Sequence, residues 1–194
     1  CYIWNVEIDG NYYYSQSTLV AFLESEGAGC GSKKSQIVPS EIEENITEIS
    51  GSLFRGCNNL KSVKIPDSVA SIGVYAFKGC SSLKNIELPE NVESIGSEAF
   101  RECSSLESIS IPKNVAKIDD YTFYNCTNLK AIDISNGVED IGKYAFYGCS
   151  SLESVELPKS VTSIGEYVFY ECSGLKNVGM SDGLESIGRW AFYK

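Results

Sequence analysis

The sequence predicts a mainly parallel β-solenoid, in which each copy of a short repeat forms one coil and successive coils stack. Three observations predict this fold class. Six cysteines recur every 23 residues, at Cys57, Cys80, Cys103, Cys126, Cys149 and Cys172. Seven phenylalanines keep the same interval from Phe54 to Phe192, and a set of apolar positions repeats between them. A fixed period of roughly 20 to 50 residues indicates coils that bury their apolar side chains by stacking on one another.

Each coil is expected to contain one or two short strands. In the coil that begins at Cys80, Leu83, Ile86 and Leu88 are apolar and Glu87 is polar. Apolar residues at i and i+2 are typical of a strand with one buried face. A residue without an N–H ends a hydrogen-bonded ladder at little cost, and proline follows this strand at Pro66, Pro89, Pro112 and Pro158, with Ser135 and Ser181 replacing it in two coils. A second extended segment is expected over residues 92–95.

Glycine follows the second extended segment in five coils, at Gly73, Gly96, Gly142, Gly165 and Gly188. This position therefore suits a turn that needs a positive φ or a close approach of two backbones. Asp119 takes the place in one coil, and Asp tolerates a positive φ better than most residues. The segment that follows, such as residues 166–170, is predicted to form a single helical or 3₁₀ turn that anchors the buried Phe169.

The six periodic cysteines are predicted to be buried free thiols. They share an apolar column with Leu and Phe, where cysteine behaves as a small hydrophobic residue. Identical coils aim their Cβ vectors in parallel, which does not suit a disulfide. Cys1 and Cys30 lie outside the period and could pair with each other.

The repeated string Leu-x-x-Ile-x-Leu-Pro-x-x-Val-x-x-Ile-Gly-x-x-Ala-Phe-x-x-Cys resembles the BspA-like, or Treponema pallidum type, leucine-rich repeat family. The resemblance covers residues from about Ile37 to Lys194 and is specific because every coil repeats the string. It implies a right-handed leucine-rich-repeat solenoid in a secreted or surface-attached protein. It also implies adhesion to proteins of a host or a neighbouring cell, and it brings no shared catalytic residues.

Two parts of the chain are distinguished by the repeat. Residues 1–36 lack it and are predicted to form an N-terminal cap, with a β-hairpin turning at Asp9-Gly10 and a short helix beginning near Ser17. Residues 37–194 are predicted to form the solenoid, with about six to seven coils. Because the chain stops directly after the turn at Phe192, we expect either truncation of a longer protein at the C-terminus or an edge that meets another chain.

Composition excludes several functions. The chain has no histidine, so Ser-His-Asp catalysis, Cys-His catalysis and imidazole metal sites are ruled out. We expect no enzyme, no catalytic, cofactor-binding or metal-binding residue, and no cofactor. A net charge of −10 disfavours nucleic acid as a partner. No apolar run approaches the roughly 18 residues of a membrane-spanning helix, so membrane insertion is not expected.

An aromatic stripe is the first candidate binding site. The last four coils carry an aromatic residue two places before and one place after the buried phenylalanine: Tyr121, Tyr124, Tyr144, Tyr147, Tyr167, Tyr170, Trp190 and Tyr193. Stacked coils would align these pairs into a patch, and exposed Tyr and Trp are enriched at protein interfaces. The alternative is that each ring lies over its neighbour's backbone and helps hold the coils together while staying partly exposed.

The outward residues of the strands are the second candidate site. They are Lys84, Asn85, Glu87, Glu107, Ser108, Ser110, Lys130, Ala131, Asp133, Glu153, Ser154 and Glu156. Small and charged side chains without aromatic anchors make a weaker site, although by resemblance the strand face is the usual binding surface of leucine-rich repeats.

The function predicted from these features is a non-enzymatic extracellular or cell-surface adhesion module that recognises a host or neighbouring-cell protein. A carbohydrate-binding or cell-wall-associated module is the alternative, because aromatic platforms also stack on sugar rings. A structural spacer without a ligand is the third possibility, and edge-to-edge self-association is compatible with all three.

Overall fold

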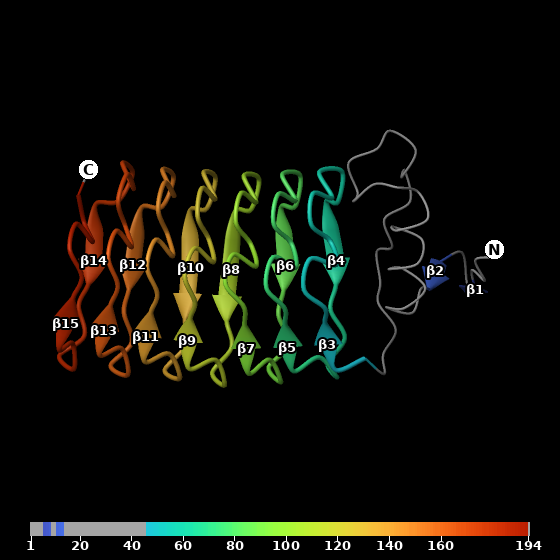
Figure 1. Ribbon diagram of the computed structural model, residues 1–194, viewed down its shortest axis with the longest axis horizontal. Coiled ribbons are helices and arrows are strands. Elements are labelled where there is room, and N and C mark those ends of the chain that lie inside the picture. Colours follow the sequence, from blue (N-terminus) through green and yellow to red (C-terminus); the bar gives the residue numbers. More distant parts are fainter. Residues whose placement is uncertain (1–5, 9–10, 14–45, 194) are drawn as a thin grey trace.

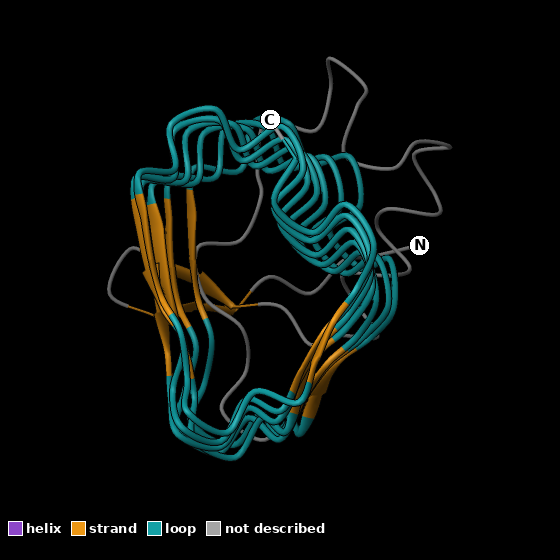
Figure 2. Ribbon diagram, turned by 90° about the vertical axis from the view of Figure 1, so that its left-hand side faces the viewer, coloured by secondary structure: helices purple, strands orange, loops and turns teal. Residues whose placement is uncertain are grey.

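The computed structural model describes residues 6–8, 11–13 and 46–193, and residues 46–193 form a stack of coils along a nearly straight axis (Figure 1). The stack has about six turns. Viewed along that axis, successive coils superpose, with strands on two sides and turns between them (Figure 2). The predicted solenoid is therefore confirmed.

Two ladders of parallel strands run along the stack. The long-strand face consists of β4 (Ser62–Lys64), β6 (Asn85–Glu87), β8 (Ser108–Ile111), β10 (Ala131–Ile134), β12 (Ser154–Glu156) and β14 (Asn177–Gly179). The short-strand face consists of β3 (Glu48–Ile49), β5 (Ser71–Ile72), β7 (Ser94–Ile95), β9 (Lys117–Ile118), β11 (Asp140–Ile141), β13 (Ser163–Ile164) and β15 (Ser186–Ile187). In both ladders, residues one period apart are paired, as Ile132 is with Ile109.

The segment before the repeats is described only at β1 (Val6–Ile8) and β2 (Asn11–Tyr13), which pair antiparallel. The helix expected near Ser17, the boundary between residues 36 and 37 and the pairing of Cys1 with Cys30 lie outside the described residues. The capping role of this segment stays a prediction.

Side chains from equivalent positions fill the interior as continuous columns. The rings from Phe54 to Phe169 are buried, and neighbouring centroids lie 5.0–5.5 Å apart with planes 1–5° from parallel. Similar columns of Ile, Leu, Val and Cys surround them. Each buried Leu, Ile or Phe contributes about 1.5–3 kcal/mol. Since a coil touches only its neighbours, stability depends on the interfaces between adjacent coils.

The segment around each phenylalanine is a series of turns, so the predicted helical or 3₁₀ turn is wrong for the described coils. Two residues per coil have a positive φ, as Tyr144 (57°) and Gly148 (69°) do. Alternate N–H groups donate to the next coil: Tyr144 to the Glu166 carbonyl at 2.9 Å, Phe146 to Val168 at 3.0 Å and Gly148 to Tyr170 at 2.9 Å. A helix would use these N–H groups within its own coil. All of these bonds point toward the following coil.

The glycines after the short strands allow close backbone contact and do not have a positive φ. A Cβ on Gly96 would lie 2.7 Å from the Val74 nitrogen, and one on Gly165 would lie 2.8 Å from the Lys143 nitrogen. Asp119 takes this position in one coil, and there the short-strand ladder divides into β3-β5-β7 and β9-β11-β13-β15. We infer that the Asp119 side chain holds these two coils apart.

The cysteine column contains five buried thiols, at Cys80, Cys103, Cys126, Cys149 and Cys172. Each S–H donates to the carbonyl of the phenylalanine one coil earlier, at 3.0–3.2 Å. Cys57 is disulfide-bonded, so the prediction of a free thiol is wrong at that position.

Candidate functional site

The structure brings all eight residues of the predicted aromatic stripe together in two adjacent columns on the turn side of the coils. We call this set the aromatic ladder. One column contains Tyr121, Tyr144, Tyr167 and Trp190, and the other contains Tyr124, Tyr147, Tyr170 and Tyr193. The first column occupies the left-handed position of each turn, with φ between 57° and 60°. The inter-coil hydrogen bonds of the turns therefore fix where the rings lie.

The tyrosine rings stack face to face along each column. In the first column, Tyr121 and Tyr144 have centroids 4.7 Å apart, and Tyr144 and Tyr167 are 4.8 Å apart. In the second column, the separations are 4.8 Å, 5.2 Å and 5.1 Å from Tyr124 to Tyr193. Most ring faces are therefore covered by the next coil, and the tyrosine rings between the ends are half-buried.

The two columns also contact each other within a coil. Tyr144 and Tyr147 are tilted at 45° with centroids 5.9 Å apart, and Trp190 meets Tyr193 edge-on at 5.1 Å. Tilted and edge-on pairs are favourable for aromatic rings, and each such pair contributes about 0.5–1.5 kcal/mol beyond burial. The aromatic ladder is thus held rigid from two directions.

A charged network continues the ladder toward the earlier coils. The Arg101 guanidinium lies 4.6 Å from the Tyr124 centroid, in cation–π contact. It also pairs with Glu98 at 3.1 Å, and Glu98 pairs with Lys78 at 2.7 Å. The sequence shows these residues at the positions equivalent to the tyrosines, but their network was missed. The sequence signal for this network is that Lys78 and Arg101 occupy equivalent positions of adjacent coils. The acidic Glu98 lies between them in the chain.

The environment of the aromatic ladder raises the pKa values of two of its tyrosines. Burial raises the pKa of Tyr147 to about 12, helped by the Glu171 carboxylate, which accepts a hydrogen bond from the hydroxyl. Burial and the neighbouring Tyr121 and Tyr167 also raise the pKa of Tyr144. The tyrosine hydroxyls at these positions are therefore neutral donors at physiological pH.

In the charged network the shift has the opposite sign. Partial burial alone would raise the pKa of Glu98. The hydrogen bond and charge of Lys78 and the charge of Arg101 outweigh this, and the pKa lies below its usual value.

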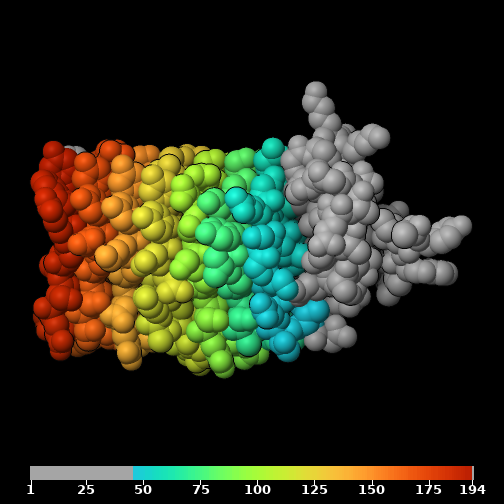
Figure 3. Space-filling model, viewed as in Figure 1, coloured from blue at the N-terminus to red at the C-terminus, as the bar shows by residue number. Residues whose placement is uncertain are grey.

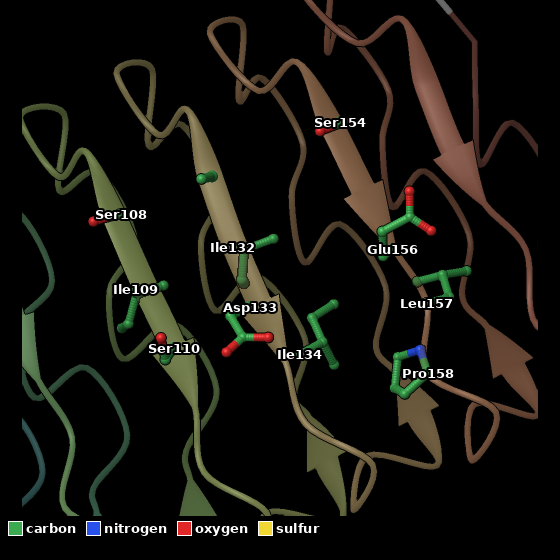
Figure 4. A pocket seen from close by; sticks show the side chains of 11 residues that line it. Ser108, Ile109, Ser110, Ile132, Asp133, Ile134, Ser154, Glu156, Leu157 and Pro158 are labelled. Carbon is green, nitrogen blue, oxygen red and sulfur yellow. The ribbon is translucent and has the colours of Figure 1, made fainter.

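The second predicted surface, the long-strand face, contains two shallow hollows. One, of about 440 Å³, lies over β8, β10 and β12 and is lined by Ser108, Ser110, Asp133, Ser154 and Glu156 among others (Figure 4). The other, of about 520 Å³, lies over β4 and β6 and includes Lys64, Asn85 and Glu87. Beside them, Lys130 forms an ion pair with Glu107 at 3.0 Å and Glu153 forms one with Lys176 at 3.3 Å, each between adjacent coils.

Catalytic chemistry has little support in residues 46–193. Burial raises the pKa of the Cys80 thiol to about 12 and the pKa values of Cys103, Cys126 and Cys149 well above the ordinary value. A thiol with such a pKa is a poor nucleophile. Within the described residues, no cluster of three or more acidic or cysteine side chains could hold a metal ion. The same residues form no helix of the length and apolarity that crossing a membrane requires.

This geometry, two short parallel strands and one buried phenylalanine turn per 23-residue coil, defines a leucine-rich-repeat solenoid. The chain belongs to the BspA-type leucine-rich repeat family, whose model matches residues 29–153 and 93–194 in six copies. Solenoids of this family are generally non-enzymatic. A search of curated proteins found no significant match.

Solved structures support the same assignment. The leucine-rich repeat protein of Treponema pallidum is 34% identical, with 76% of this chain and 72% of that chain covered and a TM-score of 0.73. A leucine-rich repeat protein of Eubacterium ventriosum is 26% identical, with 80% and 44% covered and a TM-score of 0.75. A leucine-rich cell surface protein of Faecalibacterium prausnitzii is 29% identical, with 89% and 36% covered and a TM-score of 0.59. The chain thus spans less than half the length of the last two proteins.

Proposed function

We propose that the protein is a non-enzymatic binding module at a cell surface, and that its aromatic ladder contacts a protein of a host or a neighbouring cell. The observation that carries this proposal is the pair of stacked columns, which hold tyrosine hydroxyls and ring edges in fixed rows. Ordering a flexible side chain on binding costs about 0.5–1.5 kcal/mol. Rings already fixed by stacking avoid most of that cost.

The chemistry of the ladder favours a protein partner. Tyr and Trp are enriched among the residues that dominate binding energy at protein interfaces. Each tyrosine ring offers apolar edge area together with a hydroxyl, and the raised pKa values of Tyr144 and Tyr147 keep those two hydroxyls neutral at physiological pH. The overall charge of −10 opposes an anionic partner such as nucleic acid.

A surface location is supported by similarity. The Faecalibacterium prausnitzii protein is described as a cell surface protein, and this chain spans 36% of its length. A location outside the cell is part of the proposal for this chain.

A carbohydrate ligand is the second candidate, because aromatic residues also bind sugars. Sugar rings stack on aromatic faces, and the faces inside the ladder are covered by neighbouring rings at 4.7–5.2 Å. This arrangement favours the protein partner over the sugar.

Replacing hydroxyls without disturbing the stacks tests the proposal. We would replace Tyr124, Tyr147 and Tyr170 by Phe. The triple variant and the original chain would then be screened against arrays of extracellular-matrix proteins and of glycans. We expect binding to a matrix or cell-surface protein that weakens in the triple variant while the melting temperature changes little, because Phe keeps the ring stack. The matched control is Tyr75→Phe, outside the ladder.

Two results would count against the proposal. If a protein ligand bound the triple variant and the original chain equally well, the tyrosine hydroxyls of the aromatic ladder would not be part of the contact. Binding confined to the glycan array would favour the carbohydrate module instead.

A further inference from the structure

A row of alternating charges runs beside the aromatic ladder. Three places before each buried phenylalanine, the four coils of the ladder carry Asp120, Lys143, Glu166 and Arg189. We call this row the charged rim. The charges of Lys143 and Glu166 both act on the Tyr144 hydroxyl, and the Arg189 guanidinium lies 5.3 Å from the centroid of the Trp190 ring. The charged rim therefore borders the first ring column.

Contacts within the protein hold the charged rim in order. The Asp120 carboxylate accepts the backbone N–H of Lys143 at 2.8 Å, and the Lys143 ammonium pairs with Glu166 at 3.3 Å. The side chains of Lys143 and Glu166 still expose 56% and 45% of their surface, so each can also contact a charge on another molecule. Along the four coils the rim presents the order negative, positive, negative, positive.

This order of charges is complementary to itself when it is reversed. If a second copy packs face to face with its solenoid axis antiparallel, a two-fold axis at the centre of the four coils places Asp120 opposite Arg189 of the second copy and Lys143 opposite Glu166. A two-fold contact uses the same patch on both molecules, so each of these pairs occurs twice. A shift by one coil would place Lys143 opposite its own equivalent. Like charges disfavour that register, so the charges select a single alignment.

The aromatic ladder matches itself under the same two-fold axis. Each ring column faces its own equivalent, so Tyr144 meets Tyr167 of the second copy. The stacked tyrosines lie 4.7–5.2 Å apart in both molecules, and their rows therefore stay in register along the contact. On the other side of the ladder Glu171 faces Gly148, so no like charges meet there.

We propose that the aromatic ladder and the charged rim form a homophilic contact, in which the partner on a neighbouring cell is the same face of a second copy of this chain, packed antiparallel. This inference rests on the function proposed above and names its protein partner. The contact is lateral and differs from edge-to-edge self-association. Four coils about 4.8 Å apart place the outermost rings only about 14 Å from each other. A single contact is therefore small and weak, and many copies displayed on two surfaces act together through multivalency.

Exchanging charges in the rim tests the proposal. In Lys143→Glu both central positions of the rim are negative, and in Glu166→Lys both are positive, so each variant opposes like charges in a contact with itself. A mixture of the two variants restores opposite charges at both positions. The matched control is Lys130→Glu, which makes the same change of charge in an ion pair of similar exposure, with Glu107 on the long-strand face.

We would coat fluorescent beads of two colours with these proteins and count mixed aggregates. Beads that carry the original chain should aggregate, and each rim variant alone should lower aggregation by at least about tenfold, because like charges then meet twice in the contact. Beads with Lys143→Glu should aggregate again with beads that carry Glu166→Lys. The Lys130→Glu control should change aggregation by less than about twofold, because screening weakens charges outside the contact.

A separate variant tests the rings without changing the net charge. Tyr144→Glu with Tyr147→Arg copies Glu98 and Arg101, which an earlier coil carries at the equivalent positions as an ion pair. Removing the central rings in this way should abolish aggregation. Equal thermal melting of all variants shows that lost aggregation does not come from unfolding.

The proposal is overturned if the original chain does not aggregate, if Lys130→Glu weakens aggregation as much as Lys143→Glu does, or if mixing the two rim variants restores nothing. Failure here is distinct from failure of the proposed function. A matrix protein that binds the original chain and loses affinity in the Tyr124/Tyr147/Tyr170→Phe variant would keep the ladder as a binding site. Its partner would then be a protein other than a second copy.

Discussion

At the scale of single residues, the repeat uses cysteine and tyrosine for more than filling space. The Phe77 carbonyl accepts the Cys80 N–H of its own coil at 3.0 Å and the Cys103 S–H of the next coil at 3.2 Å. Each such thiol thus satisfies the second lone pair of a buried carbonyl. The sequence identified the buried column but could not reveal this bond, because the bond depends on how two coils are offset.

The raised pKa of Tyr147 predicts a loss of stability at alkaline pH. The ordinary value of 10.0 is raised to about 12, so the unfolded chain ionises this hydroxyl before the folded protein does. The contribution of the neutral Tyr147 hydroxyl to the free energy of unfolding is complete below pH 10. It is lost as the pH rises toward 12. We expect the urea midpoint to fall across this range and to fall less in Tyr147→Phe.

Tyrosinate absorbance of the folded protein measures directly whether the Tyr147 hydroxyl ionises at a raised pH. Tyr75→Phe is the control, since it also removes one hydroxyl but lies outside the stacked columns. Identical alkaline unfolding of the Tyr147→Phe protein and the original chain would show that Tyr147 does not titrate abnormally.

At the scale of elements, the strands were predictable and the turns were not. Period-two alternation at Ile86 and Leu88 correctly gave a strand, because side-chain alternation is visible within one coil. The segment around each phenylalanine was predicted to form a single helical or 3₁₀ turn that anchors the buried ring. Every second N–H of this turn instead donates to the next coil, and Tyr144 has a left-handed φ of 57°.

The candidate sites were also predictable only in part. The sequence placed all eight residues of the aromatic ladder correctly, because equal spacing in the repeat means alignment in the stack. It could not show that the rings cover one another's faces. Nor could it place the hollow that Asp133 and Glu156 line on the long-strand face.

The glycine after each short strand predicts a steric effect on the ladder. Gly165→Ala should place a Cβ 2.8 Å from the Lys143 nitrogen, too close for β11 and β13 to remain paired. We expect a destabilisation of about 1–3 kcal/mol, as for other overpacked sites. Urea unfolding measures it, and faster amide exchange at residues 163–165 locates it.

The matched control is Asp119→Ala. Its coil already accommodates a Cβ at this position, and the exposed Lys117–Asp119 ion pair that it removes contributes about 0–1 kcal/mol. If Gly165→Ala were no more destabilising than this control, steric contact at the glycines would not explain the division between β7 and β9.

At the scale of the whole molecule, the coils form successive bands of one continuous surface on the face that Figure 3 shows. Each coil contacts mainly its two neighbours, so the free energy of unfolding should be approximately a sum of interface contributions. The core and the exposed surface can therefore vary independently of each other. The Phe and Cys columns persist from coil to coil while the surface changes from charged to aromatic along the stack.

Removing one whole repeat tests this additivity. Deleting residues 104–126 joins Cys103 to Thr127 in the same phase of the repeat. We expect a folded protein that is shorter by about 4.8 Å, with a smaller urea m-value because less surface is buried. Small-angle scattering and urea unfolding measure the two changes, and an unfolded product would contradict additive coils.

The one-way hydrogen bonds of the turns have an electrostatic consequence. In the turns around each phenylalanine, every inter-coil N–H points toward the following coil, as at Ser52, Phe54 and Gly56. Aligned peptide dipoles sum, so these rows act like a helix laid along the solenoid axis, with the negative pole at the early coils. Arg55, Lys78 and Arg101 lie in the same column toward that pole. The basic side chains there offset a field that the backbone itself creates.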